Sequence, residues 1–275
     1  MKPAGAEPLG DTNARAAIAY LARAPYENVF LNWLIERDPW IDTRAATYVY
    51  ASGGTVCGVA YFGRQIVIAA EGEDAVAAFA AIAPSYPHER MIVGRRETVA
   101  RYWKIVRGCH VPARIVRDEQ PLLMVDRETL RGASGGVLVR RATPAEWEAV
   151  ARNSARMIQA ELEYDPRAYG SAFDANVRRM IETGLWWVGE YAGDLCFFCN
   201  AGPHSDRTLQ LQGIWVPPAL RGHGLASAAL FGVCERLLEN VPTISLYVNG
   251  FNVRALALYE RAGFTRVGAF TTLLF

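Results

Sequence analysis

The residues best placed to do chemistry form a short glycine-containing loop at the start of an apolar helix. The loop comes after an apolar strand that contains Trp215 and Val216, and it consists of Arg221, Gly222, His223, Gly224, Leu225 and Ala226. Unpaired N–H groups at a helix N-terminus, together with the helix dipole, bind anions. Glycine at two positions lets the backbone approach a phosphate closely, and the arginine adds positive charge. The loop therefore predicts a diphosphate site.

A second polar motif lies one strand further along the chain. Residues 245–249 are predicted to form that strand, and Asn252 is placed to cap the next helix. Tyr259 lies within this helix, ahead of Gly263 and Phe264. The region lacks the lysine of a P-loop, and it also lacks the third glycine and acidic partner of a dinucleotide-binding fold. The loop is therefore a different kind of diphosphate site.

Together, the two motifs resemble the GCN5-related N-acetyltransferase (GNAT) family. The family's diphosphate loop reads Q/R-x-x-G-x-G/A, and its later helix reads N-x-x-A-x-x-L-Y followed by G-F; residues 221–226 and 252–264 match both. The resemblance covers residues 137–275. Within the family, the chain is similar to a bacterial subgroup that carries an uncharacterised N-terminal domain. It implies an α/β (α+β) fold with a mixed, mostly antiparallel sheet flanked by helices.

The resemblance also implies a cosubstrate and a reaction. Acetyl-CoA, or another acyl-CoA, is expected to bind with its pantetheine arm paired to the backbone of Trp215 and Val216, and with Asn252 on the other side. Tyr259 is expected near the thioester sulfur, where it protonates the departing thiolate as a general acid. A tyrosine that merely packs against the sheet is the alternative. The reaction expected is direct acetyl transfer to a primary amine in a ternary complex, without a metal.

The general base and the acceptor are less directly indicated. Many family members carry a carboxylate on the strand before the loop, but residues 209–213 here contain glutamines, which cannot act as a base. Glu161, at the end of a predicted helix, is the leading candidate; a solvated helix end, with water as the base, is the other interpretation. Carboxylates and aromatic rings near this helix end favour a cation with an apolar body. The residues concerned are Glu161, Glu163, Tyr164, Asp165 and Tyr169. Small amines, amino-acid derivatives and peptides all remain open as acceptors.

Both halves of the chain have nearly the same order of predicted helices and strands. Residues 1–131 are interpreted as a degenerate GNAT-like domain, 132–136 as a glycine-rich linker and 137–275 as the catalytic domain, which ends in strands within 264–275. In the first half, acidic Glu71, Glu73 and Asp74 occupy the place of the diphosphate loop and would repel phosphate. We therefore expect one cofactor per chain, and a first half that covers the catalytic sheet and shapes the acceptor cleft.

Composition excludes several classes of function. The 275 residues include 29 Lys and Arg against 28 Asp and Glu, so no strong positive charge favours nucleic acid. No apolar stretch reaches the roughly 18 residues that a membrane span requires, and the N-terminal residues do not resemble a signal peptide. These features predict a cytoplasmic protein, with no membrane or nucleic-acid partner, as a monomer or homodimer.

The five cysteines predict reduced thiols rather than a disulfide framework. Cys196 and Cys199 form a C-x-x-C in an apolar strand, for which core packing is the expected role. Cys234 lies mid-helix without a neighbouring histidine, which disfavours a covalent acyl intermediate.

Two alternatives to the enzyme remain. One is a non-catalytic acyl-CoA sensor, which has no need of the Tyr259 proton donor, and the other is a binding protein without a CoA site.

Overall fold

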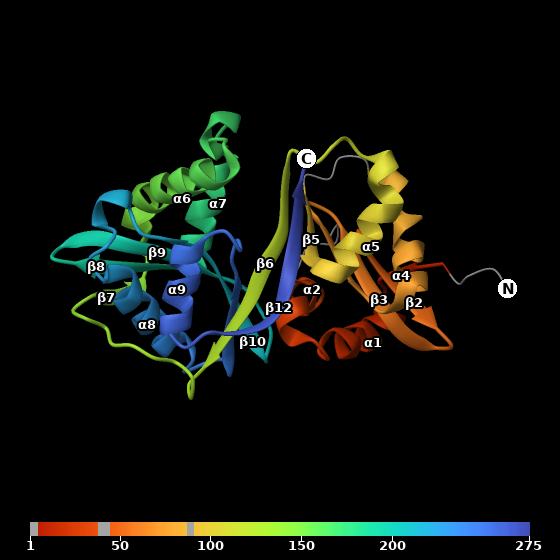
Figure 1. Cartoon of the computed structure of the whole chain (residues 1–275), viewed down its shortest axis with the longest axis horizontal. Helices are drawn as coiled ribbons and strands as arrows, with labels where there is room; N and C mark the ends of the chain where they lie inside the picture. Colours follow the sequence, from red (N-terminus) through yellow and green to blue (C-terminus); the bar gives the residue numbers. More distant parts are fainter. Residues whose placement is uncertain (1–4, 38–44, 87–90) are drawn as a thin grey trace.

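The strands form one continuous sheet with helices on both faces (Figure 1). The computed structural model describes residues 5–37, 45–86 and 91–275. Across these residues the sheet has twelve strands in the order β1-β2-β3-β4-β5-β12-β6-β11-β10-β9-β8-β7. Two neighbouring pairs, β4–β5 and β10–β11, are parallel, and the others are antiparallel. The expected mixed, mostly antiparallel sheet is confirmed.

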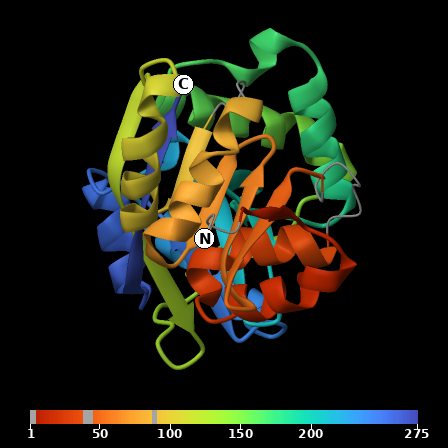
Figure 2. The same cartoon turned by 90° about the vertical axis from the view of Figure 1, so that its right-hand side faces the viewer.

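The first half of the chain places one helix pair on each face of its strands (Figure 2). One pair is α1 (Asp11–Leu21) and α2 (Pro25–Arg37), and the other is α4 (Gly72–Ala80) and α5 (Arg96–Val106). Short 3₁₀ helices are η1 (Ala83–Ser85) and η2 (Arg107–Cys109). The strands are β1 (Glu7–Pro8), β2 (Thr47–Ser52), β3 (Thr55–Phe62), β4 (Ile66–Ala70), β5 (Met91–Arg95) and β6 (Ile115–Asp126).

Alternation along these strands creates two cores, one on each face. Val59 and Val67 pack with α1 and α2, whereas the adjacent Ala60 and Ile68 pack with α4 and α5. Side chains of consecutive strand residues point to opposite faces, so a strand buried on both faces is apolar at nearly every position. This explains the continuous apolar runs in β3 and β4.

The second half repeats this layout. Its helices are α6 (Trp147–Leu162), α7 (Ala172–Glu182), α8 (Leu225–Leu237) and α9 (Val253–Arg261), with 3₁₀ helices η3 (Pro144–Glu146), η4 (Pro166–Tyr169) and η5 (Pro218–Leu220). Its strands are β7 (Leu138–Arg141), β8 (Trp186–Tyr191), β9 (Asp194–His204), β10 (Thr208–Trp215), β11 (Thr243–Tyr247) and β12 (Thr265–Leu274). α8 and α9 pack on one face and α6 and α7 on the other.

The two halves exchange their last strands at the centre of the sheet. β6 belongs to the first half in sequence but lies between β11 and β12, while β12 pairs with β5 of the first half. Figure 1 shows β6 and β12 side by side between the two groups of helices. Phe270 and Leu273 of β12 are buried in the first half's cores, and Leu123 and Val125 of β6 are buried in the second half's core. Each half therefore completes the other's core.

This exchange corrects two expectations. Residues 264–275 form the single strand β12 rather than several strands, because β6 occupies the position beside β11. The first half extends the sheet edge to edge instead of lying over it, although α2 does pack against β9 and β10. The expected linker, residues 132–136, lies in the loop between β6 and β7.

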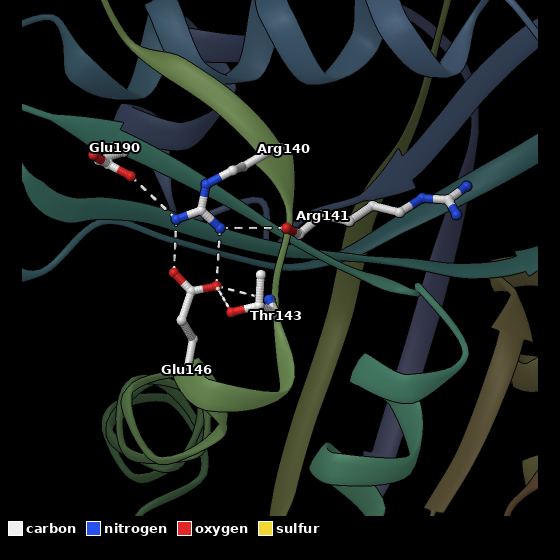
Figure 3. Close-up of polar contacts among 5 residues, drawn as sticks. All are labelled: Arg140, Arg141, Thr143, Glu146 and Glu190. Carbon is white, nitrogen blue, oxygen red and sulfur yellow. Dashed lines mark hydrogen bonds and ion pairs between the residues drawn. The ribbon is translucent and has the colours of Figure 1, made fainter.

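A partly buried ion pair fixes the junction between β7 and α6 (Figure 3). Arg140 donates through both Nη atoms to the Glu146 carboxylate, at 2.9 and 2.7 Å, and Nη2 also donates to Glu190 at 3.1 Å. The same carboxylate accepts from the Thr143 backbone N–H and hydroxyl, at 2.7 and 2.9 Å, as a capping box. These donors, Arg140 foremost, lower the pKa of Glu146 to about 2.

We expect Glu146→Gln to destabilise the fold by about 3 kcal/mol at pH 7, because the pKa falls from 4.5 to about 2 and a difference of one unit corresponds to about 1.4 kcal/mol. Since the folded-state pKa is depressed from 4.5 to about 2, this stabilisation is present above pH 4.5 and is lost as the pH falls toward 2. Urea unfolding at pH 7 and pH 3 measures it. The control is Glu190→Gln, which removes only one contact and should cost less; equal stability of wild type and Glu146→Gln at pH 7 would contradict the prediction.

Candidate functional site

The candidate site begins where β10 and β11 stop pairing. The two strands are paired in parallel only from Thr208 to Gln210, opposite Thr243 to Ser245. Beyond that point β10 contains a bulge at Gly213, whose φ of +61° suits glycine, and a Cβ there would lie 3.0 Å from Nδ2 of Asn200. A bulge bends a strand and redirects the residues after it. The end of β10 therefore diverges from β11.

The glycine loop lies directly after this divergence and is open to solvent. Gly222 and Gly224 have φ values of +86° and +77°, and Gly224 is the N-cap of α8. The backbone N–H groups of Ser227 and Ala228 donate hydrogen bonds to the Gly224 carbonyl, and these are the first such bonds of α8. Among the described residues, the backbone N–H groups of residues 222–226 have no hydrogen-bond acceptor. The loop thus presents a run of unpaired donors at a helix N-terminus, which is a site for an anion.

Arg221 braces the loop against the end of β10. Its Nε donates to the Val216 carbonyl at 3.0 Å, and its guanidinium lies 4.5 Å from the centre of the Trp215 ring. The Val216 carbonyl is thus already bonded within the chain. The arginine places its charge beside the loop and also holds the loop's geometry.

Asn252 caps α9, as its position in the sequence predicts. Its Oδ1 accepts from the Ala255 N–H at 3.2 Å, while its own N–H donates to the Asn249 carbonyl at 2.8 Å. The apolar neighbours Phe251 and Val253 are 76% and 70% exposed. The helix start therefore carries an apolar surface at the end of β11.

Tyr259 lies in α9 with its ring buried against Phe264, 5.7 Å between centroids. Burial raises the pKa of its hydroxyl, and the negative charge of Glu161 raises it further. The phenol is therefore held in its protonated form at neutral pH, which is the form that donates a proton.

Glu161 lies in the last turn of α6, with its side chain 45% exposed. Its Oε2 is 3.6 Å from Nη1 of Arg117, and its backbone carbonyl accepts from Nη2 of Arg117 at 2.8 Å. Arg117 belongs to β6, more than forty positions away in the chain. Sequence reasoning missed it, because no local motif marks an arginine in a strand of the other half.

The other residues of the acidic and aromatic cluster have different surroundings. Asp165 accepts from the Arg167 N–H at 2.9 Å and caps η4, and Glu163 ends α6 in the left-handed conformation, with φ of +61°. Tyr164 and Tyr169 form an edge-to-face pair at 6.0 Å and are exposed. Of the three carboxylates, Glu161 is the one whose negative charge helps to raise the pKa of the Tyr259 hydroxyl.

The cysteines of interest lie inside the second half's core. Cys196, Cys199 and Cys234 are at most 1% exposed, which confirms core packing. Burial raises the pKa of all three thiols and so disfavours the reactive thiolate. In the described part of the chain, no three His, Cys, Asp or Glu side chains are grouped to hold a metal ion. No described helix is long and apolar enough to cross a membrane.

The equivalent position in the first half is different. There β4 and β5 pair in parallel only at Ile66 and Val67, and Gly72, with φ of +80°, begins α4. The preceding Glu71 forms an ion pair with Arg23. A carboxylate at this helix start occupies the region where a diphosphate would need positive charge.

Comparison with known proteins agrees with this geometry. Residues 153–264 match the acetyltransferase (GNAT) family, and residues 45–150 match a domain of unknown function, DUF4081. The comparison with curated proteins gave no match.

Solved structures resemble the chain over nearly its whole length. A Drosophila protein is 13% identical with a TM-score of 0.68, covering 98% of both chains. A GNAT-family acetyltransferase from Colwellia psychrerythraea is 12% identical with a TM-score of 0.60, over 99% of this chain and 100% of that one. A tandem GNAT protein from the clavulanic acid biosynthesis pathway is 13% identical with a TM-score of 0.55, over 98% and 97%.

The fold and the order of its elements thus define a tandem GNAT-like protein, in which two similar halves share one sheet. Within this chain, residues 153–264 match the GNAT acetyltransferase family as one domain.

Proposed function

We propose that this protein transfers an acetyl group from acetyl-CoA to a primary amine, by direct attack in a ternary complex. The observation that carries the proposal is the run of unpaired N–H groups at residues 222–226, of which 222–224 are exposed, beyond the point where β10 and β11 diverge. The loop would bind the diphosphate, and Arg221 would hold it in place. The backbone of Trp215 and Val216 would pair with the pantetheine arm on one side, and the Asn252 side chain on the other.

Tyr259 would act on the leaving group. When the amine nitrogen attacks the thioester carbonyl, the C–S bond breaks and the thiolate needs a proton. A free phenol has a pKa near 10 and a thiol one near 8.5, so the tyrosine donates only where geometry assists it. Burial raises the pKa of this hydroxyl, which keeps it protonated but makes it a weaker acid, so the proposed transfer depends on close alignment of the hydroxyl with the sulfur.

Glu161 would accept the proton that the amine loses, directly or through water. Its half-exposed carboxylate lies at the end of α6, and its negative charge contributes to the raised pKa of the Tyr259 hydroxyl, which supports pairing this base with the proposed acid. The exposed Tyr164 and Tyr169 beyond it favour an acceptor with an apolar body beside its amine. Small amines, amino-acid derivatives and peptide amines are the classes to test.

Thiol release from acetyl-CoA, screened across amines, amino acids and peptides, tests this function. We expect primary amines to be the best acceptors and Glu161→Gln to reduce turnover about 10²-fold or more, as is typical of a lost general base. The matched control is Glu182→Gln, an exposed carboxylate that ends α7. Acetyl-CoA binding without turnover on any acceptor would instead indicate a sensor. Preference for anionic or hydroxyl acceptors, with Glu161→Gln fully active, would overturn both the amine and the base.

A further inference from the structure

We infer that Arg117 of β6 is a positioning residue for the acceptor side of the second half's site, so that the first half of the chain is a working part of that site. The inference rests on the proposed function. It concerns the role of a residue that lies outside the GNAT-matching region 153–264.

The exchanged strand brings Arg117 to the site. β6 lies between β11 and β12, and Arg117 is directly opposite Thr272 of β12. Its side chain is only 9% exposed. An arginine buried to this degree is uncommon unless its charge and donors have partners.

The guanidinium joins the ends of two elements. Nη1 donates to Oδ1 of Asn249, just beyond β11, at 2.8 Å. Nη2 donates to the Glu161 backbone carbonyl in the last turn of α6 at 2.8 Å, and the Glu161 carboxylate lies 3.6 Å from Nη1. A planar guanidinium holds its donors in a fixed fork, so one rigid group sets the distance between the end of β11 and the end of α6. A cation at a helix C-terminus also interacts favourably with the helix dipole.

A buried chain of hydrogen bonds continues from Asn249 into the sheet. Oδ1 of Asn249 also accepts from Nε2 of Gln120 at 2.9 Å, and Oε1 of Gln120 accepts from the Thr272 hydroxyl at 2.5 Å. The Asn249 carbonyl in turn accepts from the Asn252 N–H. Arg117 thus fixes both the proposed base and the residue that leads into the cap of α9.

The electrostatic surroundings agree with this position. Burial raises the pKa of the Tyr247 hydroxyl on β11; the Arg117 charge opposes this rise and the Glu161 charge adds to it. The groups that act on one another here come from β6, β11 and α6. Of these elements, only β6 comes from the first half of the chain.

Arg117→Met and Arg117→Lys test the inference in the full chain. Methionine keeps much of the volume but removes the fork, and we expect the kcat/KM for the amine to fall about 10²-fold, as for a misplacement of about 1 Å. Acetyl-CoA affinity should fall much less than kcat/KM, because the diphosphate loop is not touched and only the Asn252 contact to the pantetheine arm is loosened. Lysine restores the charge without the fork and should recover only part of the activity.

Arg114→Met is the matched control. Arg114 precedes β6 and also donates to the end of α6, at the Leu162 carbonyl (3.1 Å), but no described hydrogen bond joins it to Asn249 or to the Glu161 carboxylate. It should retain near wild-type kcat/KM. Amide hydrogen exchange gives a readout without acceptor: the Asn252 N–H should exchange faster in Arg117→Met and not in Arg114→Met.

Wild-type kcat/KM in Arg117→Met, or an equal loss in Arg114→Met, would overturn the inference. So would a loss of acetyl-CoA affinity that accounts for the whole effect. If the wild type releases no thiol with any amine, the proposed function fails. Unchanged exchange at Asn252 in Arg117→Met then overturns this inference separately, whereas faster exchange there supports it.

Discussion

Gly224→Glu is expected to weaken acetyl-CoA binding about 10²- to 10³-fold while the fold survives. Two like charges about 4 Å apart repel by roughly 4 kcal/mol at an effective dielectric constant of about 20. Gly224 caps α8 beside the unpaired N–H groups, and a Cβ there would meet no atom within 4 Å, so the side chain is accommodated without a clash. Titration calorimetry measures the change against a wild type that should bind one acetyl-CoA per chain.

Two variants separate charge from backbone strain in this experiment. Gly224→Gln carries the same strain at φ +77° but no charge, so it should weaken binding less than Gly224→Glu. Gly72→Glu makes the same change at φ +80° at the first residue of α4 in the first half, again in open space, and should leave the affinity intact. A Gly72→Glu variant as defective as Gly224→Glu would place the cofactor in the wrong half. A wild type that does not bind at millimolar concentration would end the acetyl-CoA hypothesis.

Tyr259→Phe is expected to lower turnover about 10²-fold or more while acetyl-CoA affinity stays nearly unchanged, because only the proton donor is removed. The ring remains to pack against Phe264. Because burial raises the pKa of this hydroxyl above its usual value near 10, wild-type turnover should show no loss from its ionisation across the neutral range. Turnover as a function of pH, for both proteins, measures these effects.

The matched control is Tyr102→Phe. Tyr102 occupies the same position along α5 as Tyr259 does along α9, and it is fully buried. Its change should leave turnover intact, since the first half has no diphosphate loop. Full activity in Tyr259→Phe would remove this residue from the mechanism, and equal losses in both variants would indicate a packing effect.

The sequence by itself determined the local features, which depend on residues that are close together in the chain. Glycines at 222 and 224, followed by an apolar helix, define a helix N-terminus with free N–H groups, because the backbone conformation depends on those residues alone. Asn252 caps α9 for the same reason. The element order of each half could be predicted from its apolar periodicity.

Strand partners were decided only by the tertiary structure. β6 and β12 each contain an apolar run, and the pattern of side chains along each says which residues are buried but not which neighbour buries them. The exchange depends on the whole sheet, where Phe270 fills a core of one half and Val125 a core of the other.

The partner of the proposed base likewise could not be predicted from the sequence. Glu161 was identified from a local acidic helix end, but its partner Arg117 comes from a strand paired across the exchange. Hydrogen bonds and charges act over a few ångströms whatever the distance along the chain. Spacing in the sequence therefore located the carboxylate, and only the folded sheet placed the guanidinium beside it.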